Sequence, residues 1–299
     1  MQEPSFLRKG DKIAIIAPAR KISVEEVAPA IEILESWGLE AVMGKNLHAA
    51  CHQFAGTDEQ RAEDLINAFA DESIKAVLCA RGGYGTIRTL STALRQKPSF
   101  VTPKWLIGYS DITVLHSYLN KTGIMSLHAT MPVNFEINTP DTLNHLKKLL
   151  FGQGPVTYEF EGNNLNVPGY VEAEIAGGNL SVIYSLRGTA YETNYDGKIL
   201  FIEDLDEYLY HIDRMMMNLK TGGVLNRISG MLVGDMPDMH DNTVPFGKDA
   251  CEIIYEHVAE LGIPVGFIKG IGHLKKNLPL VLGRSVKMSV EKEKTVLFL

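Results

Sequence analysis

The stretch IKAVLCARGGYGTIRTLSTAL, residues 74–94, contains the structural unit that decides the fold. Its apolar run 74–79 predicts a buried strand, and the spacing of apolar residues over 86–94 predicts a helix. The glycine-rich turn 81–85 between them allows the backbone to reverse direction sharply. The stretch therefore predicts one strand–turn–helix unit of a parallel sheet.

The same unit recurs through the first half of the chain. We expect strands over 12–17, 39–43, 74–79 and 105–109, and helices over 24–37, 57–69, 86–94 and 111–119. This alternation predicts an α/β fold with a doubly wound parallel sheet of the Rossmann or flavodoxin type, covered by helices on both faces. Ligands bind such sheets beyond the carboxyl ends of the strands.

Glycine, proline and asparagine interrupt the alternation over residues 151–168, which we interpret as a linker. We therefore expect an N-terminal domain over 1–150 and a smaller mixed α/β domain over 169–299. The patterns in this second domain predict strands over 171–175, 198–202, 230–233, 265–266 and 287–290, and helices over 179–186 and 249–261.

The composition narrows the class of protein. The chain has 299 residues, 45% of them hydrophobic, and a net charge of -7 without a basic stripe, which disfavours nucleic-acid binding. The N-terminus does not resemble a secretory signal, and no apolar run is long enough to span a bilayer, so we expect a cytoplasmic protein. The three cysteines form no CxxC pair and there is no HExxH motif, so we expect no metal and no cofactor.

Ser110 stands where the predicted strand 105–109 meets the predicted helix 111–119. A serine on such a turn exposes its hydroxyl at the sheet edge, and the N–H of Asp111 would point toward an oxyanion formed beside it. Gly108 fits this turn, whereas Ile112 departs from the second glycine of G-x-S-x-G. The alternative is that Ser110 only caps the helix.

The turn at 81–85 has three interpretations. The N–H of Gly82 or Gly83 could supply a second oxyanion donor, the turn could cradle a phosphate, or it could simply join two packed elements. It matches neither G-x-G-x-x-G nor the P-loop.

A serine nucleophile needs a base, and nine histidines are available. His273 follows an apolar strand that runs into a glycine-rich loop. A side chain at such a position points away from the edge of a sheet and can reach a site there. The alternative is that His273 is an ordinary surface residue. His116 faces away from Ser110 along the predicted helix and is interpreted as structural. His211 and His240 fall in charged segments that we interpret as irregular.

The base needs an acidic partner to orient it. Glu203 ends the predicted strand 198–202 on the same face as Ile199 and Phe201, and Asp204 lies on the opposite face. The acidic run 203–207 could instead be a solvated loop or an oxygen-ligand metal site, although it lacks the calcium-loop spacing.

Six short motifs are spread over the chain, at Arg81–Gly85, Gly108–Asp111, Gly177–Leu180, Leu200–Asp204, Asp213–Arg214 and Gly272–His273. Their types and order resemble the LD-carboxypeptidase family of serine peptidases, the muramoyltetrapeptide carboxypeptidases. The resemblance runs from about residue 10 to 283 and implies that Ser110, Glu203 and His273 form a Ser-His-Glu triad. The chain departs from the family at 128–132, where His-Ala-Thr-Met-Pro replaces the frequent His-Gly-Pro-Met. The resemblance therefore does not predict the shape of the pocket wall that these residues form.

The resemblance implies release of the terminal D-alanine from murein tetrapeptides during peptidoglycan recycling, with a murein peptide as partner and no nucleic acid or membrane. A homodimer is expected from the family alone. An exopeptidase also needs a group for the substrate's free carboxylate, either a buried arginine or a helix N-terminus, which the sequence does not identify.

Two other functions compete with this interpretation. The microcin-immunity branch of the family cleaves aminoacyl-nucleotide analogues with the same triad, but tends to carry an inserted loop with a base-stacking aromatic. The short segment 203–214, which contains no tryptophan, argues against that branch. A non-catalytic nucleotide-binding module that uses the turn 81–85 is the third reading, and the presence of all three triad positions weighs against it.

Overall fold

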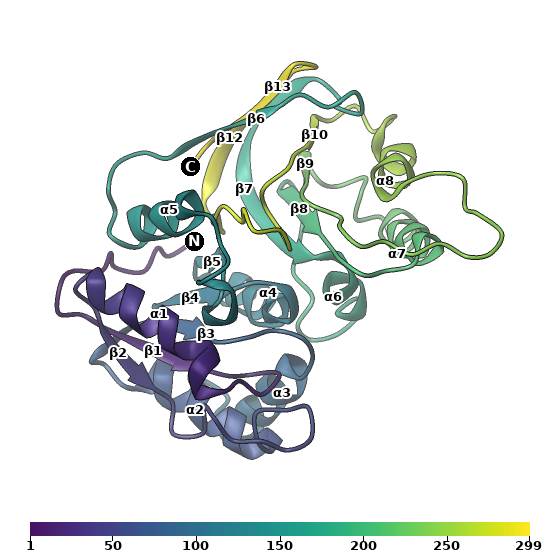
Figure 1. Ribbon diagram of the computed structural model, residues 1–299. Helices are drawn as coiled ribbons and strands as arrows, with labels where there is room; N and C mark the ends of the chain where they lie inside the picture. Colours follow the sequence, from purple (N-terminus) through teal and green to yellow (C-terminus); the bar gives the residue numbers. More distant parts are fainter.

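The computed structural model describes residues 1–299 and contains one sheet in each half of the chain (Figure 1). The first sheet has the order β11-β5-β4-β3-β1-β2, in which β11 is Leu280–Leu282. Its parallel strands are β1 (Lys12–Ile16), β2 (Glu40–Met43), β3 (Ile74–Cys79), β4 (Trp105–Gly108) and β5 (Ser126–His128). The five helices of this half are α1 (Val24–Ser36), α2 (Asp58–Ala70), α3 (Thr86–Gln96), α4 (Thr113–Thr122) and α5 (Pro140–Leu150).

Alternating side chains of the first sheet enter two different cores. Ile13 and Ile15 of β1 pack with α1 and α5, whereas Ala14 and Ile16 pack with α2, α3 and α4. Both faces are therefore covered by helices, which explains why these strands are continuous apolar runs. The predicted doubly wound sheet is confirmed.

The second sheet has the order β10-β9-β8-β7-β12-β13-β6. Its strands are β6 (Thr157–Glu161), β7 (Gly169–Asn179), β8 (Ile199–Glu203), β9 (Gly230–Val233), β10 (Val265–Phe267), β12 (Ser285–Val290) and β13 (Lys294–Phe298). Strands β7 to β10 are parallel and the other three join antiparallel. Helices α6 (Leu180–Ser185), α7 (Leu209–Thr221) and α8 (Ala250–Val258) pack on one face, so the mixed α/β character is confirmed.

Several features differ from the sequence-based expectations, among them β5, α5 and β13, which were not predicted. The segment 151–168, interpreted as a linker, contains β6, whose Tyr158 and Phe160 are buried. Helix α7 was not predicted, and it places His211 on a helix rather than in an irregular segment. Strand β11 (Leu280–Leu282) pairs antiparallel with β5 in the first sheet, although it comes from the far end of the chain.

The two sheets share one hydrophobic core. Its buried residues include Leu127 of the first sheet, Phe201 and Leu232 of the second, and Val281 of β11. Packing across this core therefore sets how the carboxyl ends of the two sheets face each other. None of the helices has the length and apolar character needed to span a bilayer.

Candidate active site

A cleft of about 440 Å³ opens where the carboxyl ends of both sheets meet. Its lining residues follow strands of the first sheet, as Ser110 follows β4 and Gly82 follows β3, and strands of the second, as Asp204 follows β8 and His273 follows β10. Five of the six predicted site residues line this cleft: Ser110, Asp111, Gly82, Gly83 and His273. The sixth, Glu203, lies behind His273 and is fully buried.

Ser110 has a backbone conformation that side chains rarely adopt. Its φ is +63° at the start of a short 3-10 turn, Ser110–Ile112, between β4 and α4. The Ser110 hydroxyl caps neither this turn nor α4, so the capping interpretation has no support in the structure. Such a conformation costs about 1–3 kcal/mol and is typical of functional sites.

Gly108 explains how the turn forms without a second glycine. A Cβ at Gly108 would lie 2.9 Å from Cγ1 of Ile112, so the isoleucine side chain occupies the space that the glycine leaves. Ile112 is fully buried in the core beneath α4. The departure from G-x-S-x-G therefore keeps the turn and adds packing.

The glycine-rich turn after β3 packs directly on Ser110. A Cβ at Gly82 would lie 3.1 Å from Cβ and 3.3 Å from Oγ of Ser110. The next residue, Gly83, has a φ of +105° and lies beneath the side chain of Arg20. Only glycine allows this turn to approach the serine so closely.

The side chain of Asp111 fixes the serine turn to a neighbouring helix. Its carboxylate accepts a 2.9 Å hydrogen bond from the backbone N–H of Thr86 at the start of α3. Burial raises the pKa of Asp111, and this hydrogen bond opposes the shift. The helix N-terminus stabilises the buried carboxylate, which leaves the backbone N–H of Asp111 as the group relevant to an oxyanion.

His273 and Glu203 form a hydrogen-bonded pair, with 2.5 Å between Nδ1 and Oε2. Burial by itself would lower the pKa of His273, but the carboxylates of Glu203, Asp204 and Asp235 together outweigh this effect, so the pKa lies above its ordinary value. Because Nδ1 is engaged, Nε2 is the nitrogen left to exchange a proton. No hydrogen bond joins His273 to Ser110 in this structure, although the ring of Tyr109, the residue before the serine, lies 4.7 Å from the imidazole.

The first half of the chain holds the loop that carries His273. The N–H of Thr139 donates to the carbonyl of Lys275 at 3.0 Å, and the N–H of Asn277 donates to Thr142 Oγ1 at 2.9 Å. Thr139 caps α5 and Thr142 lies in its first turn. The position of the imidazole therefore depends on both halves of the molecule.

Two further carboxyl groups lie beside Glu203. Burial and the charge of Glu203 raise the pKa of Asp204 to about 7, and the same causes raise that of Asp235 to about 6. Asp204 accepts hydrogen bonds from Asn179 Nδ2 and from the N–H of Ser181, while Asp235 accepts from the N–H of Gly270. Asp235 was not singled out from the sequence, although it follows the predicted strand 230–233 at the same sheet edge.

Sequence reasoning also missed Arg20, which lines the cleft after β1. Its signal was positional, since it lies just beyond the carboxyl end of a predicted strand. Of the other histidines, His116 is buried and contacts the carbonyl of Gly108 and Ser126 Oγ, and His211 and His240 contact Glu207 and Asp206. None of these three takes the place of His273 in the cleft.

The sequence was compared with models of known protein families and with known proteins. The model of the LD-carboxypeptidase N-terminal domain matches residues 13–129, and that of the C-terminal domain matches residues 172–288. A Bacillus subtilis relative named probable murein peptide carboxypeptidase is 36% identical, over 99% of this chain and 94% of its own length.

Two solved structures share the fold over nearly the full length of both chains. The muramoyltetrapeptide carboxypeptidase from Oxalobacter formigenes is 25% identical with a TM-score of 0.83, over 96% of this chain and 98% of its own. The microcin C7 self immunity protein MccF, in complex with aspartyl sulfamoyl adenosine, is 21% identical with a TM-score of 0.85, over 100% and 99%.

Proposed function

Because the chain belongs to the LD-carboxypeptidase family, we propose that it is a serine peptidase that releases the terminal D-alanine from murein tetrapeptides. The observation that carries this proposal is the buried Glu203–His273 pair in the same cleft as Ser110, which stands on a left-handed turn. A cytoplasmic location, expected from the sequence, and a homodimer, expected from the family, belong to this proposal as predictions.

In the proposed reaction, Ser110 Oγ attacks the carbonyl carbon of the scissile peptide bond. His273 Nε2 takes the hydroxyl proton and delivers it to the amine of D-alanine as the C–N bond breaks. Water then hydrolyses the acyl-enzyme, with His273 again as the base. Glu203 keeps the imidazole in the tautomer that accepts a proton at Nε2 and stabilises the imidazolium.

The oxyanion needs donors on the side of the carbonyl that faces the turns. We assign one to the N–H of Asp111 and the second to the N–H of Gly82 or Gly83. The contact of Gly82 with the Ser110 side chain supports this assignment, because it brings the turn within reach of the developing charge.

One experiment separates the proposal from its alternatives. The protein is incubated with UDP-muramyl tetrapeptide and, separately, with an aminoacyl-sulfamoyl adenosine, and the products are identified by mass. Release of D-alanine from the peptide alone supports the proposal, and cleavage of the nucleotide analogue alone favours the microcin-immunity function. Absence of product from both substrates favours a non-catalytic module.

A further inference from the structure

The proposed reaction requires a group that binds a carboxylate close to the nucleophile. D-alanine is the last residue of the substrate, so its carboxylate lies about one residue, or about 3.8 Å along the chain, beyond the scissile bond. The binding group must therefore line the cleft near Ser110. This inference rests on the proposed function and concerns how the same cleft selects a chain end.

The helix N-termini at the cleft are already occupied by carboxylates of the protein. The first turn of α3 donates the N–H of Thr86 to Asp111. The start of α6 donates the N–H of Ser181 to Asp204. Neither helix end is free to bind the carboxylate of a substrate.

The cleft wall formed by the second half is acidic. Asp206 and Glu207 line it, 2.5 Å from His240 Nε2 and 2.6 Å from His211 Nδ1 respectively. With the neighbouring Asp204, these carboxylates disfavour an anion on that side of the cleft. The substrate carboxylate therefore belongs on the opposite wall, which the first half forms.

Two guanidinium groups line that opposite wall, and only one is unpaired. Arg81 Nη1 lies 3.0 Å from Glu26 Oε1. The guanidinium of Arg20 makes no hydrogen bond or ion pair within the chain and is exposed to the cleft. A Cβ at Gly83 would lie 2.4 Å from Arg20 Cδ, so the arginine stem lies across the turn that packs on Ser110.

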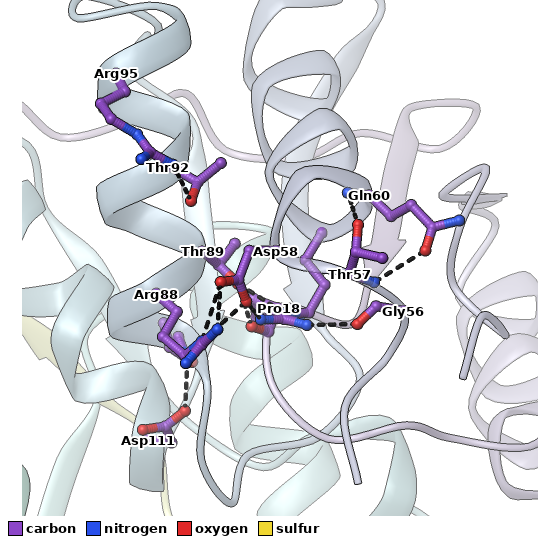
Figure 2. A network of polar contacts seen from close by, with 12 residues as sticks. Pro18, Gly56, Thr57, Asp58, Gln60, Arg88, Thr89, Thr92, Arg95 and Asp111 are labelled. Carbon is purple, nitrogen blue, oxygen red and sulfur yellow. Dashed lines mark hydrogen bonds and ion pairs between the residues drawn. The ribbon is translucent and has the colours of Figure 1, made fainter. Parts of the chain in front are cut away.

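The backbone that carries Arg20 is held on several sides. The N–H of Arg20 donates to the carbonyl of Gly82 at 3.4 Å, and the carbonyl of Ala19 accepts from Ala55 at 3.1 Å. Figure 2 shows the polar network beneath this loop, in which Thr89 Oγ1 donates to the carbonyl of Pro18 at 2.7 Å. Buried Arg61 donates in turn to Thr89 Oγ1 at 2.9 Å. Arg20 thus has no hydrogen-bonded counterion and stands on a fixed loop, which lowers the entropy lost on binding. Its charge opposes the rise that burial causes in the pKa of the Asp111 carboxylate, which already accepts a hydrogen bond from Thr86.

We propose that Arg20 binds the terminal carboxylate of the substrate and thereby makes the enzyme a carboxypeptidase rather than an endopeptidase. A guanidinium can hold a carboxylate through two parallel hydrogen bonds, which fixes the position of D-alanine as well as its charge. The scissile carbonyl then lies between Ser110 and the glycine turn.

The test compares two peptides that differ only in the end group, the tetrapeptide with its free carboxylate and the same peptide ending in an amide. The quantity measured is the ratio of kcat/KM for the two peptides. Wild type should favour the free carboxylate about ten- to a hundredfold, the range expected for a hydrogen bond between charged groups. Arg20→Gln should lose most of this preference, and Arg20→Lys should keep part of it because it retains a point charge.

Arg81→Gln is the matched control, because it removes a guanidinium from the same wall and should keep the preference. The proposal is overturned if Arg20→Gln retains the wild-type ratio, whether its absolute rates stay the same or both fall equally. Should Arg20→Gln fail to fold, an unchanged ratio in Arg20→Lys, together with loss of preference in Arg81→Gln, overturns it as well. A folded wild-type protein that cleaves neither peptide instead contradicts the proposed function itself, so the two failures are distinct.

Discussion

Ser110 combines a strained backbone with a hydroxyl that has no structural partner, so its side chain contributes little to the fold. We therefore predict that Ser110→Ala lowers kcat by several orders of magnitude, because only binding and the oxyanion donors remain to accelerate the reaction. The measurement is release of D-alanine, with urea unfolding to verify that stability is retained. An alanine variant with more than about a tenth of wild-type activity would remove Ser110 from the mechanism.

The protonation state of His273 should set the acid limb of the pH profile. A base must be neutral to accept a proton, and Glu203, with Asp204 and Asp235, raises the pKa of His273 above its ordinary value despite burial. We expect log kcat/KM to fall as pH drops through this raised pKa. In Glu203→Gln the largest attraction is lost, while burial and the weaker effects of Asp204 and Asp235 remain, so activity falls and the limb moves to lower pH.

The pKa values of Asp204 and Asp235 also lie near neutral pH, so the pH profile alone does not show which group is titrating. An NMR titration of the His273 imidazole shows whether its pKa coincides with the acid limb. The control is Asp213→Asn, because Asp213 pairs with His257 at 2.8 Å outside the cleft and should leave the limb in place. A limb that stays unchanged in Glu203→Gln would show that another group controls it.

At the scale of elements, sequence and structure agree best where continuous apolar runs form buried strands, whereas helix α5 was missed despite its Thr139 cap. The buried runs 74–79 and 230–233 became β3 and β9 with the predicted bounds. Both strands are covered on both faces, β3 by helices and β9 by helices on one side and the shared core on the other, so nearly all their side chains are apolar. Helices α3 and α4 also lack a side-chain cap and an acidic first turn and were predicted, so these missing signals do not explain why α7 was missed. Its apolar spacing at Ile212, Met215, Met216 and Leu219 was nevertheless present.

Other elements depend on contacts that no local pattern contains. The three residues of β11 join the first sheet only because β5, some 150 positions earlier, offers them an open edge. The same distinction applies to the site, where Ser110, Glu203 and His273 were recognisable at strand ends and in family motifs. Arg20 and Asp235 gain their meaning from neighbours that the fold supplies.

The network beneath the Arg20 loop joins α2 to α3 and gives a prediction about stability. Arg61 is 2% exposed and pairs with Asp58. Figure 2 shows Asp58 beside Arg88, which it also binds. Asp58→Ala leaves the Arg61 guanidinium buried without its counterion, and we expect a loss of about 3 kcal/mol in the free energy of unfolding. Urea unfolding measures the loss. Asp196→Ala, which removes the partner of half-exposed Arg227, should cost less than about 1 kcal/mol, and equal losses would contradict the prediction.

At the scale of the whole molecule, the proposed chemistry depends on how the two halves meet. Ser110 comes from the first half and Glu203 and His273 from the second, while the shared core and β11 tie the halves together. One contact between them lies close to the nucleophile, where the N–H of Asn179 donates to Thr113 Oγ1 at 3.0 Å. Thr113 begins the helix that follows Ser110, so this contact links the serine turn to the end of β7.

Gly178 makes this contact close enough to test. A Cβ at Gly178 would lie 2.5 Å from Thr113 Oγ1, so Gly178→Ala should act as a wedge between the halves. Because a displacement of about 1 Å between reacting groups can cost about a hundredfold, we expect kcat to fall by that order. In the double variant, Thr113→Ala is combined with Gly178→Ala. It removes the side-chain atoms that the new Cβ would meet most closely and should restore part of the rate. Backbone strain at position 178, where φ is +141°, would persist in this double variant. Gly188→Ala, with open space around a φ of +73°, controls for a side chain added at a positive φ away from the contact between the halves. If the double variant is no faster than Gly178→Ala, strain rather than the spacing of the halves limits the reaction.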